Sequence, residues 1–195
     1  MYGKDSGKDL KNKIIDEFRE RENGYMRLIG IDPGLALIGY GIVEEMAGRE
    51  YSRIDSGCIC TEKRMSIPDR LKTIHIAVDA LIKEYKPDAL IMEKIFFNKN
   101  VTTAIKVGEA RGVILLAASL YDLEVFEYTP LQIKQTVAGY GRATKDQVEK
   151  MVKIHLNIFK HTFRHDDESD ALAVCLCHLQ QSRWAETVER RSKID

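Results

Sequence analysis

The sequence predicts an α/β fold in which a mixed sheet is flanked by helices on both faces. Three strand-like segments follow one another through short links, a pattern typical of an antiparallel meander. After the third segment, helical and strand-like patterns alternate along the chain, and this alternation indicates a sheet covered by helices. We therefore expect a three-strand antiparallel meander plus two further strands.

The meander is expected within the first third of the chain. Residues 27–32 are a short apolar run that closes on the turn tripeptide Asp32-Pro33-Gly34. Two longer runs of strand-like residues, 36–45 and 51–61, follow it with a glycine-containing link between them.

The segments after the meander alternate between helix and strand. A helix is predicted over residues 67–85, because Leu71, Ile74 and Val78 recur on one face, and Pro87 follows its end. The next strand, residues 89–92, is apolar throughout, which favours a position inside the sheet. The remaining chain predicts a long helix, a short strand and three more helices, over residues 102–121, 124–128, 130–137, 145–157 and 167–188.

Composition and charge restrict the class of protein. The 195 residues are 44% hydrophobic, enough to bury one core, and 30 Lys+Arg balance 30 Asp+Glu. A net charge of zero gives no general attraction to nucleic acid, so contacts of that kind must come from local patches. No apolar run approaches the ~20 residues that a membrane-spanning helix needs, and the N-terminus mixes acids and bases. We expect a cytoplasmic protein that does not contact membranes.

Domain organisation is expected to be simple. Residues 1–25 predict an N-terminal extension that is not part of the fold, residues 26–182 a single domain, and residues 183–195 a charged C-terminal tail.

Four cysteines form two C-x-C pairs, Cys58/Cys60 and Cys175/Cys177. Zinc sites ordinarily use a C-x₂₋₄-C spacing. Buried small side chains in a reducing compartment are therefore favoured over a zinc site.

Four acids stand where packing alone does not require charge. Asp32 and Glu93 each follow an apolar strand, and Asp167 and Asp170 share one face of the last helix at i and i+3. A turn aspartate, a solvated strand exit and a favourable helix-dipole contact are the structural alternatives.

Convergence of these acids would demand cations. Two carboxylates ~4 Å apart repel by ~4 kcal/mol at an effective dielectric constant of 20. An all-oxygen cluster suits Mg²⁺ or Mn²⁺. Two such ions can stabilise the attacking and leaving oxygens of phosphodiester hydrolysis.

Five motifs, taken in order, resemble the RuvC family of Holliday-junction resolvases, nucleases of the ribonuclease H-like fold. The resemblance runs from Met26 to about Gln180, and it rests on Gly30-Ile31-Asp32-Pro33-Gly34, Met92-Glu93-Lys94-Ile95-Phe96-Phe97, Gly108-Glu109-Ala110-Arg111-Gly112, Gln132-Ile133-Lys134-Gln135-Thr136-Val137 and Asp170-Ala171-Leu172-Ala173. It implies an endonuclease that resolves four-way DNA junctions by paired, symmetric cleavage in recombination and repair.

The resemblance also implies a set of site residues. Asp32, Glu93, Asp167 and Asp170 would be the catalytic acids and would hold two Mg²⁺ ions, with Mn²⁺ as a substitute. Asp167 is chosen over Asp166 for its spacing from Asp170.

DNA contacts and partners follow from the same resemblance. Phe96 would stack on an unpaired base, and Lys134 and Lys145 would contact the DNA backbone. The implied partners are four-way junction DNA, a second copy of the chain in a homodimer, and a branch-migration helicase complex of the RuvA–RuvB type. The long helix over residues 102–121 carries small and apolar residues on more than one side; internal packing against the sheet explains most of them, and a dimer seam is the alternative.

Three other functions use some of the same features. A ribonuclease H-like nuclease acting on RNA–DNA hybrid would use the same acids. Actin-like kinases share the Asp-x-Gly turn but need a second similar half, for which this chain has no room. A non-catalytic DNA-binding module would leave the acids unexplained.

Overall fold

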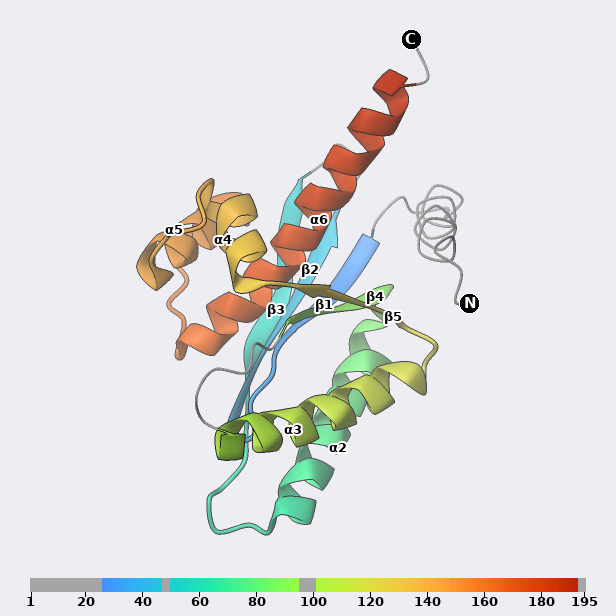
Figure 1. The fold of residues 1–195 in the computed structure, drawn as a ribbon, viewed down its shortest axis with the longest axis vertical. Coiled ribbons are helices and arrows are strands. Elements are labelled where there is room, and N and C mark those ends of the chain that lie inside the picture. The colour runs from blue at the N-terminus through green and yellow to red at the C-terminus, as the bar shows by residue number, and fades with distance from the viewer. Residues whose placement is uncertain (1–25, 47–49, 95–100, 193–195) are drawn as a thin grey trace.

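The computed structural model describes residues 26–46, 50–94 and 101–192, with side chains from 104 to 182 in the last range. Its elements, in chain order, are β1 (Met26–Asp32), β2 (Leu37–Glu45), β3 (Tyr51–Cys60), α2 (Ile67–Tyr85), β4 (Ala89–Glu93), α3 (Val101–Ser119), β5 (Glu124–Tyr128), α4 (Pro130–Ala138), α5 (Lys145–His155) and α6 (Asp166–Ser192). The five strands form one sheet in the order β3-β2-β1-β4-β5 (Figure 1).

The sheet is mixed, as the sequence predicts. β1, β2 and β3 pair antiparallel, whereas β4 pairs parallel to both β1 and β5. The three-strand meander with two further strands is therefore confirmed.

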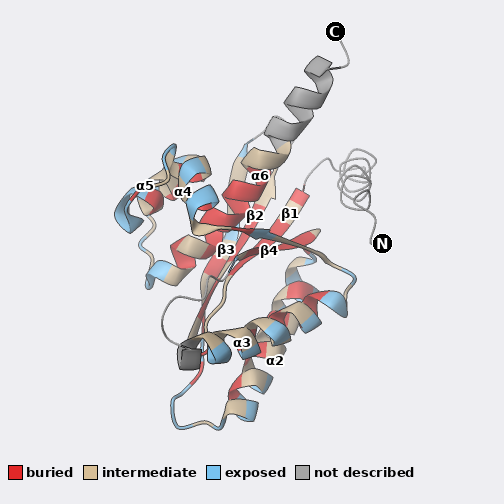
Figure 2. Ribbon diagram, viewed as in Figure 1, coloured by how far each residue is buried: buried red, intermediate tan, exposed pale blue. Residues whose placement is uncertain are grey.

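Two apolar cores fill the space on either side of the sheet. Helices α4, α5 and α6 pack on one face, over a core that includes Leu28, Ile91 and Leu172. Helices α2 and α3 pack on the other face, over a core that includes Ile29 and Leu90. Buried residues accordingly run along the sheet and the facing sides of these helices (Figure 2).

The alternation of side chains along the strands decides which face receives the strand-end acids. In β1, Leu28 belongs to the α6-side core while Ile29 and Ile31 belong to the other. In β4, Ala89 and Ile91 likewise lie on the α6 side. Because side chains repeat with a period of two residues, Asp32 and Glu93 also fall on the face that α6 covers.

Glycines let helix α6 lie directly on the strands. A Cβ atom on Gly30 would stand 2.1 Å from the Ala171 carbonyl oxygen, and one on Gly39 would stand 1.8 Å from the Asp167 carbonyl oxygen. Both are far below any tolerated contact, so only glycine permits this approach. The N-terminal turns of α6 are thereby fixed against β1 and β2.

Helix ends differ from the predicted ones by a few residues. Helix α5 ends at His155 rather than residue 157, because Leu156 is its C-cap and Asn157 takes a left-handed conformation with φ 54°. Helix α3 ends at Ser119 rather than 121, and α6 continues from Asp166 to Ser192 rather than from 167 to 188. The proposed boundaries at residues 25 and 182 stay predictions, and residues 1–25 lie outside the described residues.

All four cysteines are free thiols, but only one pair is buried as expected. Cys175 and Cys177 are both buried, since α6 has the sheet on one side and α4 and α5 on the other. The expectation of burial is wrong for Cys60, which is exposed at the end of β3, and Cys58 is only partly covered. Among the described residues, no helix has the length and apolar character needed to cross a bilayer.

The close contact between α6 and the sheet makes a stability prediction. Replacing Gly30 by Ala should lower the free energy of unfolding by about 2 kcal/mol or more, because the added methyl group must displace backbone. Urea denaturation of the variant and the wild-type protein measures the difference.

Gly108→Ala is the matched control, since nothing lies within 4 Å of a Cβ there. In helix α3 this change should leave stability unchanged or raise it by up to about 1 kcal/mol. Equal stability of the Gly30→Ala variant and the wild type would contradict the packing argument.

Candidate active site

Two of the four predicted acids lie side by side at the carboxyl ends of parallel strands. Ile31 of β1 is paired with Met92 of β4. The next residues, Asp32 and Glu93, therefore leave the sheet at adjacent positions, on the face that α6 covers. The carboxyl ends of strands are where open α/β sheets place their sites.

Helix α6 brings the other two acids to the same place. Asp32 is paired with Gly39 across the β1–β2 ladder, and the Asp167 carbonyl oxygen lies directly over Gly39. Asp167, in the first turn of α6, therefore lies beside Asp32. Asp170 follows one turn later on the same side of the helix.

Electrostatics confirm that the acids share one environment. Burial, together with repulsion from Asp170, Glu93 and Asp167, raises the pKa of Asp32 to about 7, although Lys145 opposes the shift. Burial and Asp170 also raise the pKa of Glu93. Asp32 therefore interacts with the three other predicted acids, although the four acids come from three separate elements.

A lysine partly neutralises this cluster. Lys145 Nζ lies 3.2 Å from Asp170 Oδ2 and 3.8 Å from Asp166 Oδ2. Burial first raises the pKa of Asp170; Lys145 opposes the shift, but Asp167 and Asp166 add to it. One lysine is therefore insufficient to balance the acids.

Local structure places Lys145 at this point. It is the first residue of α5, whose N-terminus is closed by a capping box between Thr144 and Gln147. Lys134, on helix α4, is close enough to lower the pKa of Glu93, as Lys145 also does. Both predicted DNA-contacting lysines therefore border the acids.

The donor chemistry of the cluster fits hard divalent cations. Four carboxylates provide only oxygen ligands, as Mg²⁺ and Mn²⁺ prefer. Within the described residues, no three His, Cys, Asp or Glu side chains stand close enough to enclose an ion as they are placed. The acids are near enough to act on Asp32, but to bind one ion the carboxylates would have to move closer together, which their mutual repulsion opposes without a cation.

Asp166 and Asp167 differ in their exposure and in the charged groups near them. The Asp166 side chain is 68% exposed, and its ion pair is with Lys145. Asp167, by contrast, acts on Asp32. Phe96, the predicted stacking residue, lies outside the described residues.

Sequence reasoning missed the support of the site beneath helix α6. Glu168 is buried and accepts a hydrogen bond from Ser56 of β3, at 2.6 Å. In the sequence Glu168 reads only as one more acid in a crowded run. No local sequence pattern indicates the bond of Glu168, because its partner Ser56 is 112 residues away along the chain.

Known proteins are similar to this chain over most of its length. The family model for crossover junction endodeoxyribonuclease RuvC matches residues 28–178. The RuvC of Alkaliphilus metalliredigens is 52% identical over 159 residues, which cover 82% of this chain and 96% of that protein. The RuvC of Halothermothrix orenii is 53% identical over 153 residues, covering 78% of this chain and 92% of the relative.

Solved structures agree with these relatives. The structure of T. thermophilus RuvC in complex with Holliday junction substrate matches with a TM-score of 0.78 and 32% identity, over 82% of this chain and 96% of that one. The yeast mitochondrial Holliday junction resolvase Ydc2, at 12% identity and a TM-score of 0.63 over 96% of this chain and 92% of its own, shares the fold. The predicted ribonuclease H-like fold is confirmed by these neighbours. The chain therefore belongs to the RuvC family of crossover junction endodeoxyribonucleases.

Proposed function

We propose that this protein is an endonuclease that resolves four-way DNA junctions by paired, divalent-cation-dependent phosphodiester hydrolysis. The observation that carries the proposal is that Asp32 and Glu93 lie at adjacent strand ends, with Asp167 and Asp170 of α6 close enough to act on Asp32. A purely structural acid at a turn would not be partly buried next to three others, because the cost of like charges rises as they leave water.

Asp32, Glu93, Asp167 and Asp170 are the residues that would hold the metal. The chemistry that two Mg²⁺ ions would supply there is stabilisation of the attacking and leaving oxygens of the phosphodiester. The protein's part is to hold the four carboxylates at the ends of β1, β4 and the first turns of α6, so that they face one phosphate from different directions. Burial keeps bulk water from screening their charge.

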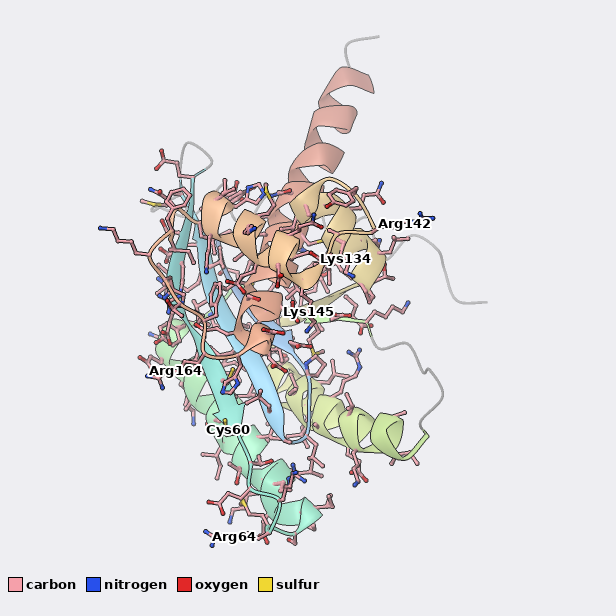
Figure 3. The ribbon with its side chains drawn as sticks, turned by 90° about the vertical axis from the view of Figure 1, so that its left-hand side faces the viewer. Cys60, Arg64, Lys134, Arg142, Lys145 and Arg164 are labelled. Atoms are coloured by element: carbon pink, nitrogen blue, oxygen red, sulfur yellow. The ribbon has the colours of Figure 1, made fainter. Side chains whose placement is uncertain are left out.

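Cationic side chains are placed to receive the DNA backbone. In the view of Figure 3, Lys134 and Lys145, which both act on Glu93, lie between Arg142 on the right and Arg164 on the left. Lys145, with its side chain 65% exposed, can exchange its ion pair with Asp170 for a phosphate once cations neutralise that acid. The N-terminus of α5, where Lys145 stands, adds backbone donors to the same surface.

Cleavage of RNA–DNA hybrid is the second candidate, because the same acids would serve it. The four-way junction is favoured because close relatives are named crossover junction endodeoxyribonucleases and a solved neighbour holds Holliday junction substrate.

A homodimer is the oligomer that we propose. A four-way junction is cut on two opposed strands, and a two-fold dimer presents two sites with matching symmetry. On α3, Ile105 and Leu116 are 57% and 53% exposed, and they share one face because 11 residues make about three helical turns.

The branch-migration helicase partner and the cytoplasmic location stay predictions. So does the stacking role of Phe96.

Amide substitutions test the function. Asp32→Asn, Glu93→Gln and Asp170→Asn should each lower Mg²⁺-dependent junction cleavage by roughly 100-fold or more, since each removes charge that binds cations. Junction binding in EDTA should persist. Labelled four-way junction, duplex and RNA–DNA hybrid are compared on gels, and paired nicks are expected in the junction alone.

Asp69→Asn is the control, because Asp69 is an exposed acid in the first turn of α2, on the far face of the sheet. It should cleave as the wild type does. Mg²⁺ should also raise the melting temperature of the wild-type protein and not that of Asp32→Asn. Substantial cleavage by the three site variants, or equal cleavage of hybrid, would refute the assignment.

The lysines make a separate prediction about binding. Lys134→Ala and Lys145→Ala should each weaken junction binding and reduce the slope of log affinity against log salt by about one. Lys83→Ala, which removes an exposed lysine on α2, is the matched control and should bind normally. Fluorescence anisotropy at several salt concentrations measures both quantities, and an unchanged slope would contradict the phosphate contacts.

The dimer is tested by sedimentation. The wild-type chain of 22.3 kDa should sediment at twice that mass, and Leu116→Glu should sediment as a monomer. Ile154→Glu, at a similarly exposed position on α5, should remain a dimer. Monomers alone in the wild type, with and without junction DNA, would overturn the proposal.

A further inference from the structure

A buried polar cluster lies under the first turn of α6, beside the acids but separate from them. At its centre is Glu168, which is 4% exposed and whose carboxylate receives bonds from three directions. Ser56 donates to Oε1 at 2.6 Å, the His161 ring nitrogen Nε2 lies 3.1 Å from the same oxygen, and the Arg164 backbone N–H donates to Oε2 at 3.4 Å. A charged group is so deeply buried only when it is compensated in this way.

The direction of the central bond is fixed by a fourth residue. Arg53 Nε donates to the Ser56 hydroxyl oxygen at 2.5 Å, so the single hydroxyl proton is left for Glu168. The cluster therefore joins strand β3, the segment before α6 and the first turn of α6 itself.

Helix geometry links this anchor to the neighbouring acid. Successive residues of an α-helix are rotated by about 100°, so a helix whose residue 168 is tied to β3 has a set rotation at residue 167. The sheet order places β2 and β1 next to β3, and the Asp167 carbonyl already rests on Gly39 of β2. Two contacts, one of side chain and one of backbone, thus fix the first turn of α6 on either side of the Asp167 side chain.

We propose that Glu168 is a positioning residue that orients Asp167 toward Asp32 for divalent-cation binding, through its bonds to Ser56, His161 and the Arg164 backbone. This inference rests on the proposed function, since it takes Asp167 as a ligand. Groups that orient metal ligands typically change metal affinity by ~10–100-fold when removed.

Two measurements test the positioning role of Glu168. The first is Mn²⁺ binding to the full-length protein without DNA, monitored by electron paramagnetic resonance. The second is the Mg²⁺ dependence of junction cleavage. Glu168→Ala should raise the Mn²⁺ dissociation constant and the Mg²⁺ concentration for half-maximal cleavage by about 10-fold or more. Junction binding in EDTA should not change. Glu168→Gln, which retains an oxygen acceptor of the same size, should restore part of the affinity.

Ser56→Ala is the milder variant, and it decides the outcome if Glu168→Ala does not fold. It should raise the Mn²⁺ dissociation constant by a smaller factor, and the double variant should bind no worse than Glu168→Ala alone, because both changes remove one interaction. Asp69→Ala is the matched control: it removes the 2.5 Å Ser66–Asp69 bond in the first turn of α2 and should lower stability without changing Mn²⁺ affinity.

Two results would overturn the positioning role. The first is a Mn²⁺ dissociation constant of the Glu168→Ala variant that is within twofold of the wild type; if that variant is unfolded, Ser56→Ala is used instead. The second is an equal change of the Mn²⁺ dissociation constant in Asp69→Ala. The Asp32→Asn variant distinguishes failure of the positioning role from failure of the proposed function. It should lose both Mn²⁺ binding and cleavage. If it retains both, the assignment of the metal site is wrong.

Discussion

Repulsion among partly buried carboxylates is the constraint on which the candidate site of this molecule depends. Asp32, at the end of β1, is partly buried and close enough to Asp170, Glu93 and Asp167 for its pKa to rise to about 7. Such an arrangement is unfavourable for folding by itself, since the charged form is both desolvated and repelled. The rest of the fold must therefore hold the acids together, and bound cations would neutralise their charge.

The glycines of the sheet provide the first part of that hold. Gly30 and Gly39 allow the backbone of α6 to rest on β1 and β2 at distances that any side chain would prevent. Buried apolar residues of α6 such as Leu172 and Leu176 then fasten the helix to the sheet. Lys145 contributes from outside the helix, through its 3.2 Å contact with Asp170. Apolar packing, which is insensitive to charge, thus offsets a local electrostatic cost.

Much of the fold was predictable because its signals are local. The strands that end at Asp32 and Glu93 are short apolar runs, and the capping residue Thr144 marks the start of α5. Helix ends were less predictable, since left-handed residues such as Asn157 are not distinctive in sequence. The exposure of Cys60 was not predictable either, because it depends on what covers the edge strand β3.

The sequence by itself determined the order of strands and helices and the family motifs, and it predicted four candidate acids, because each of these signals lies in neighbouring residues. Only the tertiary structure decided that Lys134 and Lys145 border Glu93, that Asp167 rather than Asp166 acts on Asp32, and that Glu168 is tied to Ser56. These contacts join residues from separate elements, up to 112 positions apart for Glu168 and Ser56. Their geometry depends on strand pairing and on how closely α6 approaches the sheet, and no periodicity along the chain encodes either quantity.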